Sequence, residues 1–239
     1  MKTAVVGGGW AGMAAAVELA HRGVPVTVFE AARQLGGRAR GFAADGLTLD
    51  NGPHLLLGAY RETRRLIATM HAAAAPLWRQ QLEWHIPGHF TLRAAKLPAP
   101  LHLAGALLAA RGLDWRARLA AARFMAAMRR QGFRLAADLD VSAFLRAQRQ
   151  PEELCRLLWE PMCLAALNTP PDEASAQIFL NVLRDALAAS RSASDMLFAR
   201  TDFTRLFPAP AALYVRQRGG DVRLSTAVRA ITRTDDGFA

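Results

Sequence analysis

Three glycines near the amino terminus, Gly7, Gly9 and Gly12, have the GxGxxG spacing of a dinucleotide-binding turn. An apolar run precedes them, a helix-forming segment from Ala11 to Arg22 follows, and Glu30 ends the next apolar run. The first glycine permits a tight bend, the second lets the backbone approach a pyrophosphate, and the third lets the helix pack on the strand. We expect Glu30 to accept hydrogen bonds from ribose hydroxyls. These residues predict a nucleotide-binding βαβ unit.

The first residues of this helix, Trp10 and Ala11, stand where a pyrophosphate would lie. Unpaired backbone N–H groups and the helix dipole favour anions at a helix amino terminus. We therefore include Trp10 and Ala11 among the cofactor-binding candidates, although packing is the simplest role for the Trp10 side chain.

A second glycine pair, Gly36 and Gly37, follows Glu30 closely and is itself followed by Arg38. The guanidinium of Arg38 is a forked, permanently charged donor that suits phosphate oxygens. An NAD-binding unit needs no such loop at this place, so the loop favours another dinucleotide. An ordinary surface turn is the alternative.

A third segment runs from Asp50 to Tyr60 and combines polar residues, a turn and an apolar run. This order would place its backbone and His54 at the inner edge of a cofactor cleft. We take Asn51 and Gly52 as cofactor-binding candidates. His54 is the one candidate for a catalytic role, by proton transfer or by contact with the reacting groups, and a structural loop histidine is the alternative.

The elements that must position these residues alternate at first between strand and helix. The first 75 residues predict two buried strands around the first helix, a hairpin that turns at Asp45-Gly46, and a second helix: Lys2–Val6, Val24–Glu30, Gly41–Asp50 and Tyr60–Ala75. From residue 76 short alternating runs predict irregular strands at Leu82–Ile86 and His89–Leu92.

The region from Leu101 to Ala189 has a helical pattern with arginine-rich faces. The helices expected there are Arg116–Arg130, Val141–Arg149, Glu152–Leu167 and Glu173–Ala189. Strand-type sequence then returns, with a helix end, a glycine turn and a strand over Leu213–Leu224, and a further strand over Thr226–Thr232. The pattern indicates an α/β domain that is interrupted by a mostly helical one.

Composition narrows the function classes. The chain has 239 residues, 52% of them hydrophobic, and a net charge of +10 carried mostly by arginine. That hydrophobic fraction can form a core, and no nucleic-acid module is visible, so we expect no nucleic-acid partner. The two cysteines, Cys155 and Cys163, form no CxxC pair, which supports neither a redox dithiol nor a metal site. The charge fits a solvated surface or attraction to anionic lipid.

The Leu35-Gly36-Gly37-Arg38 loop resembles the FAD-binding GGR motif of the amine oxidase and phytoene desaturase superfamily. The Asp50–Tyr60 segment resembles more narrowly the hydroxysqualene dehydroxylases, also described as squalene-associated FAD-dependent desaturases. Three later segments are similar to that family as well: Trp159–Cys163, Leu167–Pro170 and Ser192–Arg205. The resemblance extends over essentially the whole chain.

The resemblance implies a Rossmann-like FAD-binding domain formed by residues 1–75 and 205–239, and a largely helical substrate domain at 76–204. It implies FAD as the cofactor, no metal, and a contact of Val228 with the adenine side of FAD. Family members continue well beyond this length, so we expect an amino-terminal fragment with an incomplete FAD domain. The location expected is the cytoplasm, and peripheral association with the inner face of the membrane is left open.

The implied reaction is reductive dehydroxylation of hydroxysqualene, an apolar isoprenoid, to squalene in hopanoid biosynthesis. Two alternatives stay open: polyene oxidation of the carotenoid or phytoene desaturase type, and a catalytically inactive fragment. Amine oxidation is disfavoured, because the middle region is apolar and arginine-rich and shows no aromatic cage. The basic helices between residues 101 and 150 suit a substrate-domain wall or a membrane-facing entrance.

Overall fold

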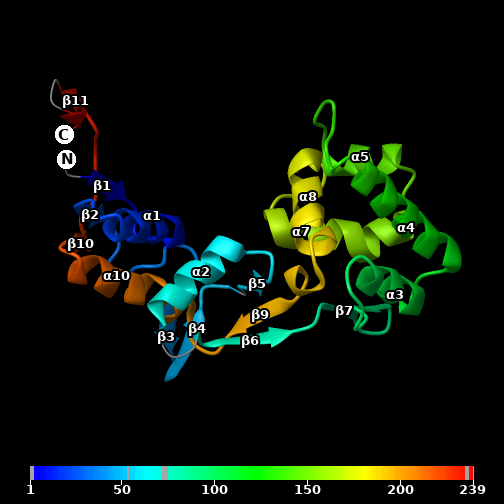
Figure 1. Ribbon diagram of the computed structural model, residues 1–239, viewed down its shortest axis with the longest axis horizontal. Coiled ribbons are helices and arrows are strands. Elements are labelled where there is room, and N and C mark those ends of the chain that lie inside the picture. Colours follow the sequence, from blue (N-terminus) through cyan, green and yellow to red (C-terminus); the bar gives the residue numbers. More distant parts are fainter. Residues whose placement is uncertain (1–2, 53, 72–74, 235–236, 239) are drawn as a thin grey trace. The chain divides into compact units, whose positions relative to one another are not determined.

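The computed structural model describes residues 3–52, 54–71, 75–234 and 237–238 (Figure 1). Lys2, Pro53 and Ala72–Ala74, which belong to segments discussed above, lie outside the described residues. The chain forms two compact units. Unit 1 comprises Met1–Leu56, Arg61–Trp78 and Leu197–Ala239, and unit 2 comprises Leu57–Tyr60 and Arg79–Met196.

Unit 1 contains a three-stranded parallel sheet in the order β1-β2-β10, with strands β1 (Thr3–Val6), β2 (Val26–Phe29) and β10 (Asp221–Arg223). Val28 on the central strand pairs with Val5 on one side and Val222 on the other. Helix α1 (Trp10–His21) connects β1 to β2 and packs beside α10 (Pro208–Gln217). Its buried residues recur at helical spacing and turn one face to the core: Met13, Ala16, Val17 and Ala20.

The predicted hairpin is present as β3 (Gly41–Ala44) and β4 (Leu47–Asp50). Its two turn residues, Asp45 and Gly46, have φ angles of 51° and 75°. Two successive left-handed residues are what a two-residue type I′ hairpin requires. Unit 1 also holds α2 (Arg61–Met70) and the short α9 (Phe203–Leu206), whose amino-terminal cap is Asp202.

Unit 2 is mainly helical. A hairpin of β7 (Glu83–Ile86) and β8 (Phe90–Arg93) precedes the helices, among which the aspartates Asp114 and Asp140 and Ser175 each cap an amino terminus. The helical elements are α3 (Leu101–Ala109), α4 (Trp115–Arg130), α5 (Val141–Ala147), α6 (Glu152–Leu154), η1 (Cys155–Trp159), α7 (Glu160–Leu167), α8 (Ala176–Val182), η2 (Leu183–Ala188) and η3 (Arg191–Ala193).

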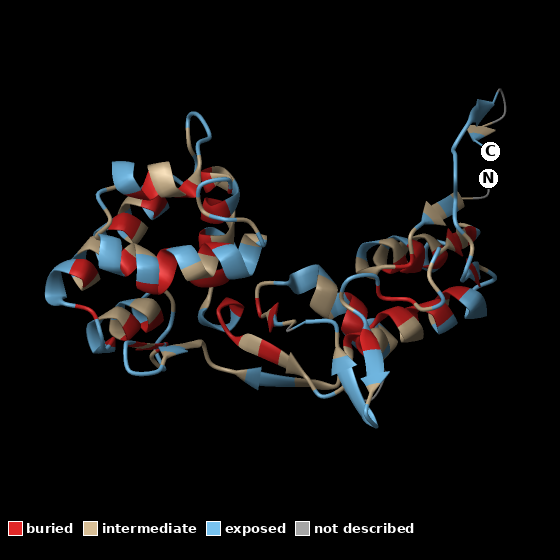
Figure 2. Cartoon of the chain, turned by 180° about the vertical axis from the view of Figure 1, so that it is seen from behind, coloured by how far each residue is buried: buried red, intermediate tan, exposed pale blue. Residues whose placement is uncertain are grey.

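The core of unit 2 is apolar and aromatic. The Phe124 ring lies 5.7 Å from that of Phe144 and 5.3 Å from that of Trp159, within the range of favourable aromatic pairs. Figure 2 shows the buried residues along the inner sides of the helices in each unit. Each unit therefore has a hydrophobic core of its own.

Three short strands form a sheet in the order β5-β9-β6: β5 (Leu56–Leu57), β9 (Met196–Ala199) and β6 (Leu77–Gln80). The unit boundaries fall within these strands, whereas the sequence places the domain boundaries at residues 75/76 and 204/205.

The strand predicted at Thr226–Thr232 does not form, so that prediction was wrong. Ser225 takes a left-handed φ of 53°, which ends β10, and the following side chains are exposed, with Ile231 at 64%. Further on, β11 (Arg233–Thr234) and β12 (Gly237–Phe238) pair with each other. The helices predicted at 152–167 and 173–189 are present but are not α-helical throughout. Each contains a π-helical turn, η1 in the first and η2 in the second.

The buried polar residue His102 is unusual in unit 2. The side chain is fully buried in α3, and neither ring nitrogen has a hydrogen-bond partner among the residues that the structure describes. Burial lowers the pKa of His102 from its ordinary 6.5, and the charge of Arg191 lowers it further while Asp195 opposes the shift. The shift favours the neutral imidazole in the folded chain.

We predict that acidification destabilises unit 2 through His102. As the pH falls below about 6.5, the unfolded chain binds a proton at this histidine before the folded chain does, so the stability present above that pH is lost. Urea unfolding followed by tryptophan fluorescence at about pH 7 and about pH 5 measures the loss. His102→Leu should reduce the difference between the two pH values, and an unchanged difference would contradict the assignment.

Candidate cofactor-binding site

The glycine turn of unit 1 holds α1 close to β1. The Gly7 N–H donates to the Phe29 carbonyl at 2.8 Å, and Gly7 has a φ of +101° that L side chains rarely adopt. A Cβ on Gly12 would lie 1.9 Å from the Gly7 oxygen. Gly7 is therefore required by its backbone conformation, and Gly12 is required because the chain packs too closely there for a side chain.

The amino terminus of α1 is open to an anion. Its cap residue is Gly9, which has no side chain to cap the helix, and the first turn contains no acidic residue. The N–H groups of Trp10, Ala11 and Gly12 have no acceptor within the helix, because the first intrahelical bond runs from the Met13 N–H to the Gly9 carbonyl. This arrangement matches the site expected for a pyrophosphate.

The structure brings the two glycine loops together. The Gly36 N–H donates to the Gly8 carbonyl at 2.9 Å, and Gly9 and Gly36 form a parallel bridge. A Cβ on Gly37 would lie 3.3 Å from the Cα of Gly9. Residues that are nearly thirty positions apart in the sequence thus form one backbone surface beside the α1 terminus.

Sequence reasoning missed the middle glycine, Gly8. A Cβ on this residue would lie 2.5 Å from Leu35 Cδ2 and 3.0 Å from Glu30 Cβ. The buried Leu35 side chain fills this space, so Gly8 lets the second loop pack against the first. The signal available was three consecutive glycines where the fingerprint needs only two.

The Glu30 side chain binds the backbone of the first glycine turn and of the residues just after β2. Its Oε2 accepts the Gly8 N–H at 2.6 Å, and its Oε1 accepts the Ala32 N–H at 2.8 Å. Each carboxylate oxygen has a further lone pair that can accept a ribose hydroxyl. Glu30 therefore ties the end of β2 to the first glycine turn and to the start of the segment that leads into the second loop, a role that the sequence did not indicate.

Arg38 and Asn51 are neighbours. Asn51 Nδ2 donates to the Arg38 carbonyl at 3.1 Å, and the Asn51 N–H donates to the Arg40 carbonyl at 2.9 Å. The Arg38 side chain is exposed, and no ion pair of its guanidinium occurs within the described part of the chain. Gly52 continues the turn with a φ of 89°. The guanidinium is thus available to a phosphate.

His54 contacts the same region. Its Nδ1 lies 2.9 Å from the Gly52 carbonyl, and its ring centroid lies 5.1 Å from that of Phe203. Because a carbonyl only accepts, Nδ1 carries the proton and a neutral His54 keeps Nε2 as an acceptor. His54 would have to be an imidazolium to act as a general acid, and its catalytic role stays a prediction.

Trp10 packs against two aromatic rings of the returning chain. Its ring centroid lies 5.2 Å from those of Phe203 and Phe207, and its Nε1 donates to the Ala39 carbonyl at 3.2 Å. The indole therefore acts as a packing residue in unit 1, with its one donor already used.

The segment that includes Asp202 and Thr204 holds this arrangement in place, and sequence reasoning missed its role. The Phe203 N–H donates to Asp50 Oδ1 at 2.8 Å, and the Gly41 N–H donates to Thr204 Oγ1 at 2.9 Å. A Cβ on Gly41 would lie 2.6 Å from Asp202 Oδ1. Asp202, as a capping residue, is a local signal that α9 begins there. It gives no signal that this segment binds Gly41 and Asp50.

Val228 is not held with the other candidates. The chain contacts Glu30 two residues before Val228, where the Thr226 N–H donates to the Glu30 carbonyl at 2.9 Å. Val228 itself lies in no strand and is 38% exposed. Its contact with an adenine stays a prediction.

Among the described residues, no three or more His, Cys, Asp or Glu side chains are grouped as a metal site would require. No described helix combines the length and the apolar character needed to cross a bilayer.

Comparison with known proteins identifies several relatives. Residues 10–239 match the family described as flavin containing amine oxidoreductase. The chain is 30% identical to the hydroxysqualene dehydroxylase of Sinorhizobium fredii, over 96% of this chain and 54% of that protein. It is 27% identical to the 15-cis-phytoene desaturase of Arabidopsis thaliana, over 99% of this chain and 44% of that protein. The chain spans about half the length of the curated relatives it matches.

Solved structures show the same fold. An oxidoreductase from Methanosarcina mazei superposes with a TM-score of 0.74 at 16% identity, covering 100% of this chain and 55% of that one. A putrescine oxidase variant gives 0.70 at 17% identity and covers 99% and 53% respectively.

Proposed function

Because the chain belongs to the family of flavin-containing amine oxidoreductases, we propose that unit 1 binds the ADP part of FAD in an FAD-dependent oxidoreductase. The observation that carries the proposal is the meeting of the two glycine loops at the uncapped terminus of α1, where the Gly36 N–H reaches the Gly8 carbonyl. The α1 N–H groups would hold the pyrophosphate, Arg38 would add a charged donor, and Glu30 would accept from the ribose.

We propose a long isoprenoid as the substrate and hydroxysqualene as the specific compound. The support is the hydroxysqualene dehydroxylase activity of relatives that match nearly the whole chain at 30% identity. Replacing the hydroxyl by hydrogen requires a hydride at the carbon and a proton for the departing hydroxyl, which leaves as water. Reduced FAD, when bound, would supply the hydride. The protein would orient the chain and exclude water.

Phytoene desaturation is the second candidate, because relatives of that activity match up to 99% of the chain at 26–27% identity. Desaturation removes a hydride and a proton from neighbouring carbons of an apolar chain, and oxidised FAD, when bound, would accept the hydride. The same nucleotide cradle serves both directions of transfer, so the cradle does not separate the two reactions.

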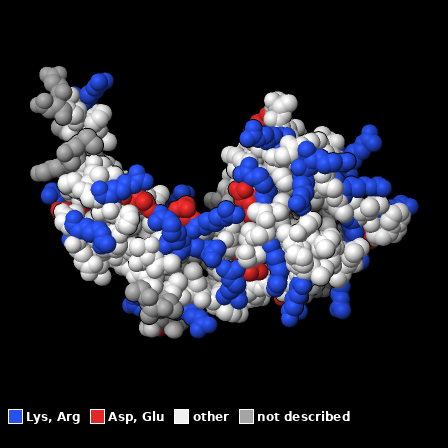
Figure 3. Space-filling model, viewed as in Figure 1, with Lys and Arg blue, Asp and Glu red and all other residues white. Residues whose placement is uncertain are grey.

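We also propose that one face of unit 2 lies on an anionic membrane. Trp115 and Leu119 are 68% and 37% exposed, and with Arg123 they follow at spacings of four residues along α4. Figure 3 shows Lys and Arg side chains spread over this unit. An exposed aromatic and aliphatic ridge beside basic side chains is typical of an interfacial helix.

For the cofactor, we predict that Glu30→Ala and Arg38→Ala each weaken FAD binding by about tenfold or more, since each removes a charged hydrogen-bond partner. Fluorescence titration of FAD with the purified chain measures this, and the retained flavin absorbance after dialysis supports it. Arg33→Ala is the matched control, because Arg33 is an exposed arginine of the same loop. Unchanged affinity in both variants would exclude the proposed cradle.

For the substrate, we predict that a form of the protein as long as its relatives converts hydroxysqualene to squalene when FAD is reduced. Gas chromatography with mass detection identifies the product. Turnover of phytoene with oxidised FAD, without any squalene formed from hydroxysqualene, would instead establish the second candidate.

For the membrane, we predict that Trp115→Gln and Arg123→Gln each lower sedimentation with vesicles that contain phosphatidylglycerol. The loss of one basic side chain near the surface should reduce the partition coefficient roughly fivefold. Arg146→Gln, on an exposed position of α5, is the charge-matched control. An equal loss in this control would mean that the net charge alone causes binding.

A further inference from the structure

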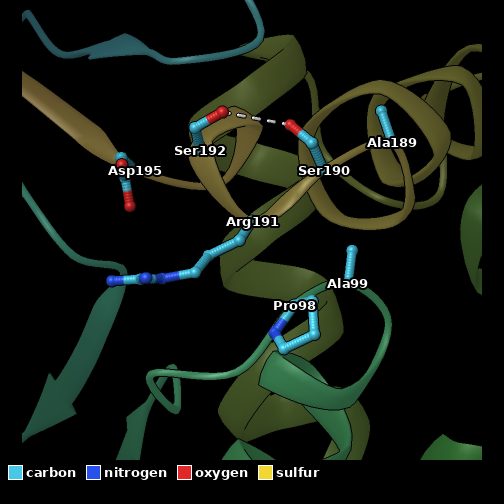
Figure 4. Close-up of a pocket in the computed structure, with 7 residues that line it drawn as sticks. All are labelled: Pro98, Ala99, Ala189, Ser190, Arg191, Ser192 and Asp195. Carbon is cyan, nitrogen blue, oxygen red and sulfur yellow. Dashed lines mark hydrogen bonds between the residues drawn. The ribbon is translucent and has the colours of Figure 1, made fainter.

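A pocket of about 520 Å³ lies within unit 2 (Figure 4). Pro98 and Ala99, just before α3, form one wall, and the segment that follows η2 forms the other. The complete lining is Pro98, Ala99, Ala189, Ser190, Arg191, Ser192 and Asp195. Apolar and polar groups thus face each other across a space large enough for a small ligand.

The charges of this lining do not cancel. Asp195 is buried and its Oδ2 accepts from Arg79 Nη1 at 2.8 Å, so its charge is compensated by an arginine outside the lining. Arg191 is exposed, and no ion pair of its side chain occurs within the described residues. The pocket therefore carries one uncompensated guanidinium, which favours an anionic ligand.

The two serines add a hydroxyl donor. Ser190 Oγ already accepts the Ala193 N–H at 3.1 Å, and it lies 3.2 Å from Ser192 Oγ. If Ser190 donates its hydrogen to Ser192, the Ser192 hydroxyl keeps its own hydrogen for a ligand. Arg191 and Ser192 both line the pocket, so a ligand inside it meets a guanidinium and a hydroxyl.

The buried histidine of α3 is consistent with this charge. His102 is fully buried, and its ring nitrogens have no hydrogen-bond partner among the described residues. Its pKa is lowered by burial and then by the positive charge of Arg191, while Asp195 opposes the shift. The histidine therefore stays neutral beside Arg191 and adds neither a counter-charge nor a second cation.

From this arrangement we infer that the pocket binds a phosphate-type oxyanion, with Arg191 and Ser192 as its donors. The inference goes beyond the proposed function, because it uses neither the flavin cradle nor the isoprenoid. The phosphate group could belong to a free small anion or to a lipid head group, and both present the same oxygens to Arg191.

The test is a titration of the chain with inorganic phosphate at constant ionic strength, followed by amide NMR shifts. We expect saturable shifts at Ser190, Arg191 and Ser192. Arg191→Gln should weaken the apparent affinity about tenfold, since a hydrogen bond from a charged donor is lost. Ser192→Ala should weaken it less. Arg184→Gln should leave it unchanged, because Arg184 pairs with Asp185 at 2.7 Å and lies outside the pocket.

A second arm distinguishes the source of the phosphate. Vesicles of phosphatidylcholine with phosphatidic acid should bind through Arg191 and be displaced by phosphate if a lipid head group is the ligand. Vesicle binding that is indifferent to Arg191→Gln, together with saturable phosphate shifts, identifies a free anion. Absence of saturable shifts in the unaltered chain, or equal weakening by Arg184→Gln, would overturn the inference.

Discussion

The close approach of two backbone loops controls the arrangement of unit 1. Gly12 must lack a Cβ for α1 to reach the Gly7 carbonyl, and Gly8 must lack one for Leu35 to be buried beneath it. Once these contacts are made, the Gly36 N–H reaches the Gly8 carbonyl and fixes the loop that carries Arg38. The Arg38 carbonyl then positions Asn51. A side chain in place of Gly12 or Gly8 would prevent the first of these contacts and therefore those that follow.

Much of unit 1 was predictable because its signals are local. The Asp45-Gly46 turn and the glycines of the first motif determine backbone conformations within a few residues, and the hairpin and α1 formed where they were predicted. The strand at Thr226–Thr232 failed because strand formation needs a neighbouring strand, and the local pattern cannot supply one. The left-handed conformation of Ser225 carried no warning in the sequence.

The contacts that hold the candidate site in place could not be predicted from local sequence either, because their partners lie far apart in the chain. Thr204 binds Gly41, and Phe203 binds Asp50, across more than 150 residues of chain. The π-helical turns of unit 2 were equally hidden, because η1 and η2 have ordinary helix-forming sequences. Sequence motifs thus named the groups that we propose to face a nucleotide, whereas tertiary contacts hold those groups in place.

Glu30 combines both roles, because it is a candidate for ribose binding and is also held in place by hydrogen bonds of its own. Its two oxygens accept two backbone N–H groups, and a glutamine, with one acceptor and one donor end, could satisfy only one of them. The turn therefore requires an acid at this position even without a nucleotide. It follows that the acid after β2 is weaker evidence for ribose recognition than the fingerprint suggests. The uncapped α1 terminus has no comparable internal explanation, since no side chain and no first-turn acid satisfies it, so the nucleotide assignment rests chiefly on that feature.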